Sequence, residues 1–175
     1  MFKTIVNYEV TVMTIKNQSM ITEKEVLKDR AAIEHRATWF YLLLDEARKD
    51  GIDWDSFARR AITRCGCFHG STMYKDIDNL KDFSNALITE TVKNIFEAEI
   101  VEVTDDKFIL EFNYCPLVAA WLKQGASEED IEKLCDIAMD GDRGIVSTLG
   151  DYELDLENTI AEGADCCRIV IEKKK

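Results

Sequence analysis

Hydrophobic residues in the first half of the chain recur every three to four positions, which is the spacing typical of amphipathic helices. This pattern predicts a long helix over residues 22–51, and Asp53 is well placed to cap a second helix. Two glycines in Cys65–Gly70 interrupt the second pattern, so we expect that helix to end there. A third helix is predicted over Asn79–Glu97. The first half of the chain is therefore expected to be helical.

The second half changes to an alternation of hydrophobic and polar residues, which is typical of strands with one buried face. A hairpin is predicted from Ile100 to Cys115, with its turn at Asp105-Asp106. Residues 152–156 and 167–171 predict a second pair of strands. Both pairs are expected to be antiparallel.

Two helices are predicted between these hairpins. Pro116 suits the first position of a helix, where no backbone donor is needed, and Cys115 then directly precedes the helix. Ser127 can cap the next helix, and the glycines of Asp140–Gly144 predict a turn. The pattern as a whole indicates an α+β fold, with a helical N-terminal half packed on a late antiparallel sheet built from two hairpins.

The length and composition favour one soluble domain. The chain has 175 residues, of which 46% are hydrophobic and 32% are charged. We assign residues 22–172 to a single α+β domain, residues 1–21 to an N-terminal extension and residues 173–175 to a basic tail.

The net charge narrows the choice of partners. The 34 acidic and 22 basic residues give a formal net charge of −12, which would repel nucleic acid and anionic membrane surfaces. No apolar run approaches the roughly 20 residues that cross a bilayer, and the N-terminus lacks a signal-peptide pattern. We therefore expect a cytoplasmic protein with no nucleic-acid or membrane partner, whose six cysteines are free thiols or metal ligands.

Several short motifs follow one another along the chain in a characteristic order. They are Glu34–Ala37, Phe57–Ile62, Tyr114–Pro116, Leu134–Asp136, Asp140–Gly144 and Thr159–Arg168. This order resembles the L-2-amino-thiazoline-4-carboxylic acid hydrolase family, and the resemblance covers residues 22–171. It implies a small-molecule substrate, a cyclic amidine bearing a carboxylate, which water opens toward a carbamoyl-cysteine product by cleavage of a carbon–nitrogen or carbon–sulfur bond.

Such a reaction needs a nucleophile, a proton donor and a cation or a set of amides for the carboxylate. Cys115 is the candidate nucleophile because backbone N–H groups at a helix N-terminus favour a thiolate, although a buried structural thiol is the alternative. His69 is the candidate acid or base. Arg143 is the candidate cation because a guanidinium can bind a carboxylate through two hydrogen bonds.

Four more residues are predicted to contribute to substrate binding: Asp140, Thr159, Asp165 and Cys167. Cys167 alternates with Ile169 and Ile171 and is expected to point inward. Asp140 could instead be a solvated charge, and Asp165 could be a turn residue. These alternatives stay open at the level of the sequence.

Cys65, Cys67 and His69 form a C-x-C-x-H pattern. In an extended loop, alternate residues point the same way, so these side chains could bind one Zn²⁺ and leave a position open for water. A helix end with small residues and a surface histidine would give the same pattern. We therefore expect no cofactor, with a divalent metal as the alternative.

Two other hypotheses compete with the hydrolase: a binding domain and a homodimeric scaffold. The Cys-Pro junction, the glycine turn and the last strand are also similar to vinyl-reductase-type small-molecule-binding domains and their trafficking-complex relatives, which bind or dock without hydrolysis. In addition, the consecutive Trp39, Phe40 and Tyr41 cannot all face one core, which makes a helical homodimer interface plausible.

Overall fold

The computed structural model describes residues 14–174, so residues 1–13 of the predicted extension and Lys175 lie outside the described chain. The helices of the described chain are α1 (Lys24–Lys49), α2 (Trp54–Met73), α3 (Leu80–Leu87), α4 (Glu90–Phe96), α5 (Pro116–Lys123), α6 (Glu128–Val146) and the 3-10 helix η1 (Ile160–Glu162). The strands are β1 (Ala98–Val103), β2 (Lys107–Phe112), β3 (Tyr152–Asn158) and β4 (Cys167–Lys173). None of these helices combines the length and the apolar character that crossing a membrane would require.

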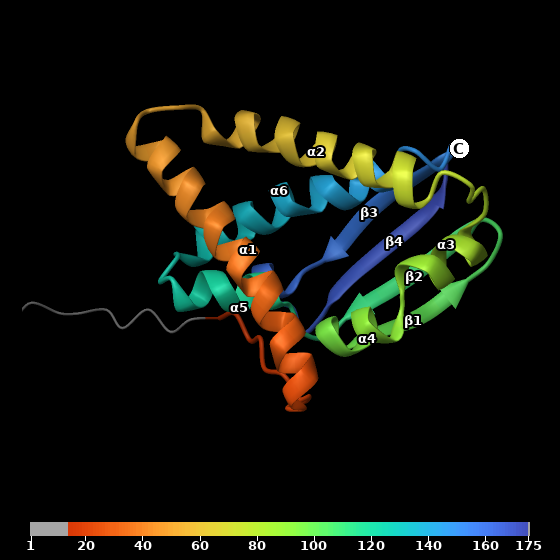
Figure 1. Cartoon of the computed structure of the whole chain (residues 1–175), viewed down its shortest axis with the longest axis horizontal. Helices are drawn as coiled ribbons and strands as arrows, with labels where there is room; N and C mark the ends of the chain where they lie inside the picture. Colours follow the sequence, from red (N-terminus) through yellow and green to blue (C-terminus); the bar gives the residue numbers. More distant parts are fainter. Residues whose placement is uncertain (1–13, 175) are drawn as a thin grey trace, which may run out of the picture.

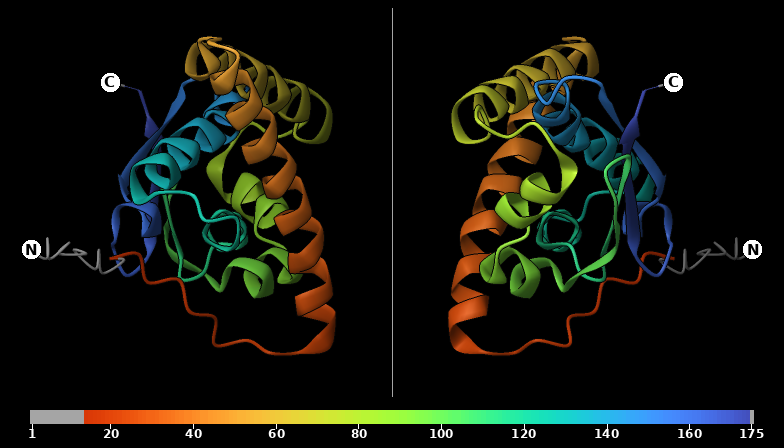
Figure 2. Two further views of the ribbon diagram at one scale, coloured as in Figure 1. Left: turned by 90° about the vertical axis from the view of Figure 1, so that its left-hand side faces the viewer. Right: turned by 90° about the vertical axis from the view of Figure 1, so that its right-hand side faces the viewer.

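The strands form one antiparallel sheet in the order β1-β2-β4-β3 (Figure 1). Each outer strand pairs with its neighbour in the sequence, and β2 pairs with β4 in the middle of the sheet. Phe108 lies opposite Ile171, and Phe112 lies opposite Cys167. The helices gather on one side of this sheet (Figure 2). The predicted α+β fold with two late hairpins is confirmed.

Buried side chains form two groups on the helical side of the sheet. The first joins α1, α5 and α6, and its largest member is Trp121, whose indole N–H donates to the carbonyl of Ala37 (3.1 Å). The second joins α3 to the central strands through Phe83, Phe108 and Leu110. Burial of such side chains stabilises a fold by roughly 1.5–3 kcal/mol each.

Close packing of α2 against α6 overturns two predictions from the sequence. A Cβ atom at Gly66 would lie 2.0 Å from the carbonyl oxygen of Gly141, and one at Gly144 would lie 2.6 Å from that of Thr63. The glycines let the two backbones approach each other, and both helices run through them without a break. The predicted helix end at Cys65–Gly70 and the predicted turn in α6 at Asp140–Gly144 are therefore wrong.

The segment predicted as one helix over Asn79–Glu97 is divided into α3 and α4. The hydroxyl oxygen of Thr89 accepts a hydrogen bond from the backbone N–H of Val92 (3.3 Å), so Thr89 caps the second helix. Both helices then lie over β1 and β2, where their apolar sides cover the sheet.

The described end of the N-terminal extension packs against the domain. Ser19 and the backbone of Ile21 bind Glu97, which also forms an ion pair with Arg30 (3.0 Å). Arg30 is only 2% exposed and also donates to the backbone carbonyl of Ile95 (2.8 Å), so its charge is fully compensated. These contacts hold the N-terminal segment against the domain, and the segment passes close to the start of α5.

Candidate active site

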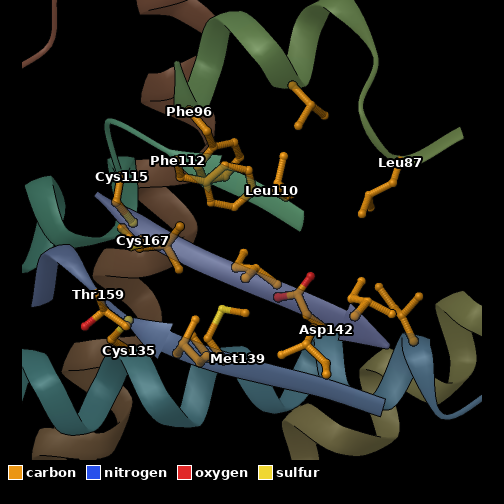
Figure 3. Close-up of a pocket in the computed structure, with 18 of the residues that line it drawn as sticks. Leu87, Phe96, Leu110, Phe112, Cys115, Cys135, Met139, Asp142, Thr159 and Cys167 are labelled. Atoms are coloured by element: carbon orange, nitrogen blue, oxygen red, sulfur yellow. The ribbon is translucent and has the colours of Figure 1, made fainter. Parts of the chain in front are cut away.

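A cavity of about 270 Å³ lies between the helical side of the sheet and helices α3 to α6 (Figure 3). Most of its lining is apolar and includes Leu87, Val92, Phe96, Leu110, Phe112, Leu117, Trp121, Met139, Leu154, Leu156, Ile169 and Ile171. The ionisable side chains on its wall are three cysteines, Asp142 and Arg36. We call this space the inner cavity.

The three cysteines Cys115, Cys135 and Cys167 lie together at one end of the inner cavity (Figure 3). They come from the start of α5, from α6 and from the start of β4. Burial raises the pKa of all three thiols, and it raises that of Cys167 to about 12. At neutral pH the three groups are therefore protonated, which suits an apolar wall better than a resting thiolate.

Cys115 occupies the N-cap position of α5, as the sequence predicts. Its backbone N–H donates to the side-chain oxygen of Asn17 (2.9 Å), and its carbonyl accepts from the amide nitrogen of the same residue (2.8 Å). Backbone N–H groups of Leu117 and Val118 act to lower the pKa of the thiol, but burial outweighs them. The extension thus fixes Cys115 in place, with its sulfur toward the cavity (Figure 3).

Asp142 is the carboxylate on the wall of the inner cavity. It comes from α6, is partly buried, and its oxygens point into the space (Figure 3). Within residues 14–174, its side chain accepts no hydrogen bond from another residue's side chain. Burial raises its pKa to about 6, although its own backbone N–H and the charges of Arg36 and Arg143 act in the opposite direction. An acid with this pKa can exchange protons near neutral pH.

A second pocket of about 270 Å³, which we call the outer pocket, lies between α1, α2 and α6. Arg36 and Asp142 line both this outer pocket and the inner cavity. Arg36 is exposed and forms no ion pair with any residue in the described chain. Its guanidinium is therefore available for an anion beside Asp142.

His69 and Cys65 line the outer pocket, whereas Cys115 lines only the inner cavity. The two predicted catalytic residues, His69 and Cys115, are therefore on the walls of neighbouring spaces rather than side by side. The residues shared by the two spaces include Asp142 and Leu117.

Arg143 and Asp140 belong to a network of ion pairs beside the cavity. Arg143 contacts Asp140 (2.7 Å) and Asp136 (2.8 Å), and Arg59 contacts the same two carboxylates (3.2 and 2.6 Å). Burial opposes ionisation of Asp136, but hydrogen bonds from Arg143 and Arg59 lower its pKa. The guanidinium predicted to bind a substrate carboxylate is thus already bound by two carboxylates of the protein.

Of the remaining predicted binding residues, Thr159 and Cys167 lie on the wall of the inner cavity and Asp165 does not. Thr159 is buried on the wall of the inner cavity, where its hydroxyl oxygen caps η1 by accepting from the N–H of Glu162 (3.1 Å). Cys167 faces inward as predicted, and its sulfur accepts from the N–H of Ile160 (3.3 Å). Asp165 is exposed and lines none of the pockets described here.

The C-x-C-x-H residues lie within α2 and not in the expected extended loop. Positions two apart in a helix point in different directions, so Cys65 and His69 line the outer pocket while Cys67 lies beside Ser147 (3.7 Å between Sγ and Oγ). No three His, Cys, Asp or Glu side chains among residues 14–174 gather closely enough to hold a metal ion. The geometry assumed for a zinc site is therefore absent.

Sequence reasoning missed Asp142, Arg36 and Asn17 as site residues. A signal for Asp142 was present, because it continues the inward series of Cys135 and Met139 along α6 once Gly141 is taken as helical. An ionisable residue on the buried side of a helix is a candidate for function. Arg36 belongs to the Glu34–Ala37 motif, but the sequence alone does not show that it lines the same pockets as Asp142, which comes from another helix.

The chain is similar to known proteins at the level of family and fold. A family model described as L-2-amino-thiazoline-4-carboxylic acid hydrolase matches residues 30–171. No curated protein matches the chain. Among solved structures, it is similar to a trafficking protein particle complex subunit 3 from Naegleria fowleri covalently bound to palmitic acid, with a TM-score of 0.56 and 14% identity. The similarity covers 81% of this chain and 95% of that chain, and it shows a shared fold.

Proposed function

Because the chain belongs to the L-2-amino-thiazoline-4-carboxylic acid hydrolase family, we propose that it is a hydrolase that opens a cyclic amidine of this kind. Water would add to the ring carbon that lies between nitrogen and sulfur. Cleavage of one ring bond at that carbon would then give a carbamoyl-cysteine, with both hydrogens of the water retained in the product. The observation that carries this proposal is the carboxyl group of Asp142 beside Arg36, where the two pockets meet.

Asp142 is the proposed acid–base group. As a carboxylate it would take a proton from the attacking water, and as a carboxylic acid it would return that proton to the sulfur or nitrogen that leaves the ring carbon. A pKa of about 6 suits both steps, because neither protonation state is costly at neutral pH. His69, on the wall of the outer pocket, is the second candidate for proton transfer.

Arg36 is the proposed partner of the substrate carboxylate. It lines the same two pockets as Asp142 and lacks a carboxylate partner within the described chain, whereas Arg143 has two. A guanidinium can bind a carboxylate through two parallel hydrogen bonds, which would also orient the ring. The apolar wall of the inner cavity would then contact the sulfur edge of the ring.

Cys115 is the alternative nucleophile. Burial opposes a thiolate there and outweighs the two backbone N–H groups at the start of α5 that support it. A thiolate attack would form a covalent intermediate at the ring carbon, which water would then hydrolyse. The choice between activated water and thiolate is open to a direct test.

The first experiment is to incubate the purified full chain with L-2-amino-thiazoline-4-carboxylate and to follow the gain of one water by mass spectrometry. We expect the wild-type protein and Cys115→Ser to form the product at comparable rates. Loss of product in Cys115→Ser alone, with the variant still folded by circular dichroism, would reassign the nucleophile to the thiol. Absence of product with the wild-type protein would contradict the proposed hydrolase.

A second candidate function is binding of an acyl chain in the inner cavity. It is favoured by the almost continuous apolar lining between Leu87 and Cys115, and the similar trafficking subunit is a protein covalently bound to palmitic acid. Native mass spectrometry with palmitic acid tests it. A one-to-one complex that excludes the thiazoline would favour a binding module, whereas no complex at saturating lipid would remove this candidate.

A further inference from the structure

The outward side of α1 carries an apolar stripe that is exposed to solvent. Its members recur three to four positions apart and are Ala31, Ala32, His35, Trp39, Leu42 and Leu43. Trp39 is 63% exposed and Leu43 is 67% exposed, although each is a large side chain on a well-formed helix. Helix α1 lies along one edge of the molecule, with α5 on its inner side (Figure 2).

The two ends of the stripe carry opposite charges. Lys24 and Lys28 lie on the same side of the helix before the stripe, and neither forms an ion pair with another residue in the described chain. Glu46 and Asp50 lie on that side after the stripe. Glu46 contacts Lys49 of its own helix through one carboxylate oxygen (2.6 Å), which leaves the other oxygen to a further partner. An exposed apolar surface with charged ends is typical of an interface between proteins.

We propose that the stripe binds the α1 helix of a second copy of this chain, with the two helices antiparallel and related by a two-fold axis at the level of Ala37. Lys28 and Glu46 lie nine residues to either side of Ala37, so the axis places Lys28 of one copy opposite Glu46 of the other. The same symmetry places Lys24 opposite Asp50. Each attractive pair occurs twice, as an isologous interface requires.

Side-chain size follows the same symmetry. Ala31 lies opposite Leu43 of the second copy, and Ala32 lies opposite Leu42, so each large side chain meets a small one. Alternation of large and small side chains lets two helix surfaces interdigitate. A parallel arrangement would instead place Lys28 against Lys28 and Leu43 against Leu43, which loses both kinds of complementarity.

The centre of the proposed interface is aromatic. The rings of His35 and Trp39 already contact each other edge to face within one chain, with centroids 5.6 Å apart. The two-fold axis brings His35 of each copy beside Trp39 of the other and forms a cluster of four rings. Tryptophan at the centre of a small interface is a common source of binding energy.

The test uses sedimentation velocity on the full chain and two charge variants. Lys28→Glu leaves acids at both ends of the stripe, and Glu46→Lys leaves bases at both ends, so each variant alone should dimerise at least about tenfold more weakly than the wild type. An equimolar mixture of the two variants restores opposite charges at both contacts. We expect the mixture to form a heterodimer about as tight as the wild-type dimer.

Two further variants separate the stripe from other exposed apolar residues. Leu43→Glu should weaken the dimer by about 100-fold, because it places a charge in the apolar part of the proposed interface. Phe68→Glu is the control, since Phe68 is also a large exposed apolar residue (64%) but lies in α2, outside the stripe, and its replacement should leave the dimer intact. A monomeric wild-type chain, a dimer that survives Leu43→Glu, or a variant mixture that stays monomeric would each overturn the proposal.

Discussion

Asp136 and Asp142 lie on the same helix, α6, but in opposite electrostatic environments. Asp136 is held by Arg143 and Arg59, which lower its pKa in spite of partial burial. Asp142 faces an apolar cavity, and burial raises its pKa to about 6. A carboxylate whose hydrogen bonds are satisfied by the protein contributes to structure, whereas one that is left unpaired in a cavity is available for proton transfer.

The largest expected effect is on turnover. Asp142→Asn removes the proposed acid–base group and should lower kcat for the thiazoline carboxylate by about 100-fold to 10,000-fold. Asp136→Asn changes a carboxylate of the ion-pair network and should lower kcat by less than about fivefold. Steady-state kinetics of both variants, with circular dichroism to verify folding, compares the two positions. Equal losses of kcat in the two variants would show that the two carboxylates do not differ in their contribution to catalysis.

A smaller effect is expected on KM when Arg36, the proposed partner of the substrate carboxylate, is replaced. Arg36→Met removes the cation beside Asp142 and should raise KM by about 10-fold to 100-fold, with a lesser change in kcat. Arg143→Met should change KM much less, because Arg143 is already bound by Asp136 and Asp140. If instead Arg143→Met gives the larger increase in KM, the carboxylate binds where the sequence alone suggested.

The smallest effects are on stability, and they have opposite signs. The pKa of Asp142 is higher in the folded chain than in the unfolded chain, so the folded state binds the proton more tightly, and stability falls as the pH rises from about 4 to about 6 and stays lower above pH 6. Asp142→Asn should therefore raise the free energy of unfolding at pH 7 by about 1–3 kcal/mol, and the gain should disappear as the pH falls to about 4. Asp136→Asn should lower it by about 0.5–1 kcal/mol.

Urea denaturation at several pH values measures both changes in stability. A gain in stability for Asp142→Asn that is the same at pH 4 and pH 7 would show that packing, and not the charge of Asp142, is responsible. A gain for Asp136→Asn would show that the ion-pair network costs more in desolvation than it returns in attraction.

The sequence was sufficient for the fold class because each hairpin and most helix starts depend on local signals. Pro116 and Ser127 mark the starts of α5 and α6, and the hydrophobic residues Phe108, Leu110 and Phe112 recur at every second position of β2. Glycine misled the prediction at Gly66 and Gly141, because a local pattern cannot show that another helix passes 2.0 Å from the position of a Cβ atom. At these two positions the tertiary contact, and not the local pattern, determines that glycine continues the helix.

The candidate site was only half predictable for the same reason. Cys115 was placed correctly at the start of α5 and Cys167 toward the interior, because Pro116 marks a helix start and strand alternation defines the direction of Cys167. The role of Asp142 depended on whether Gly141 is helical, and that of Arg36 depended on which helix crosses α1. Asn17 contacts Cys115 across 98 positions of sequence, a pairing that no local pattern contains.

The most direct test of the central claim is the dependence of kcat/KM on pH for the thiazoline carboxylate, measured from pH 5 to pH 8. If Asp142 must be ionised in the free enzyme, kcat/KM should fall about tenfold per pH unit below a midpoint near pH 6. The residual activity of Asp142→Asn should lack this midpoint. A wild-type profile that is flat across this range, or a midpoint that persists in Asp142→Asn, would contradict the assignment of Asp142 as the acid–base group.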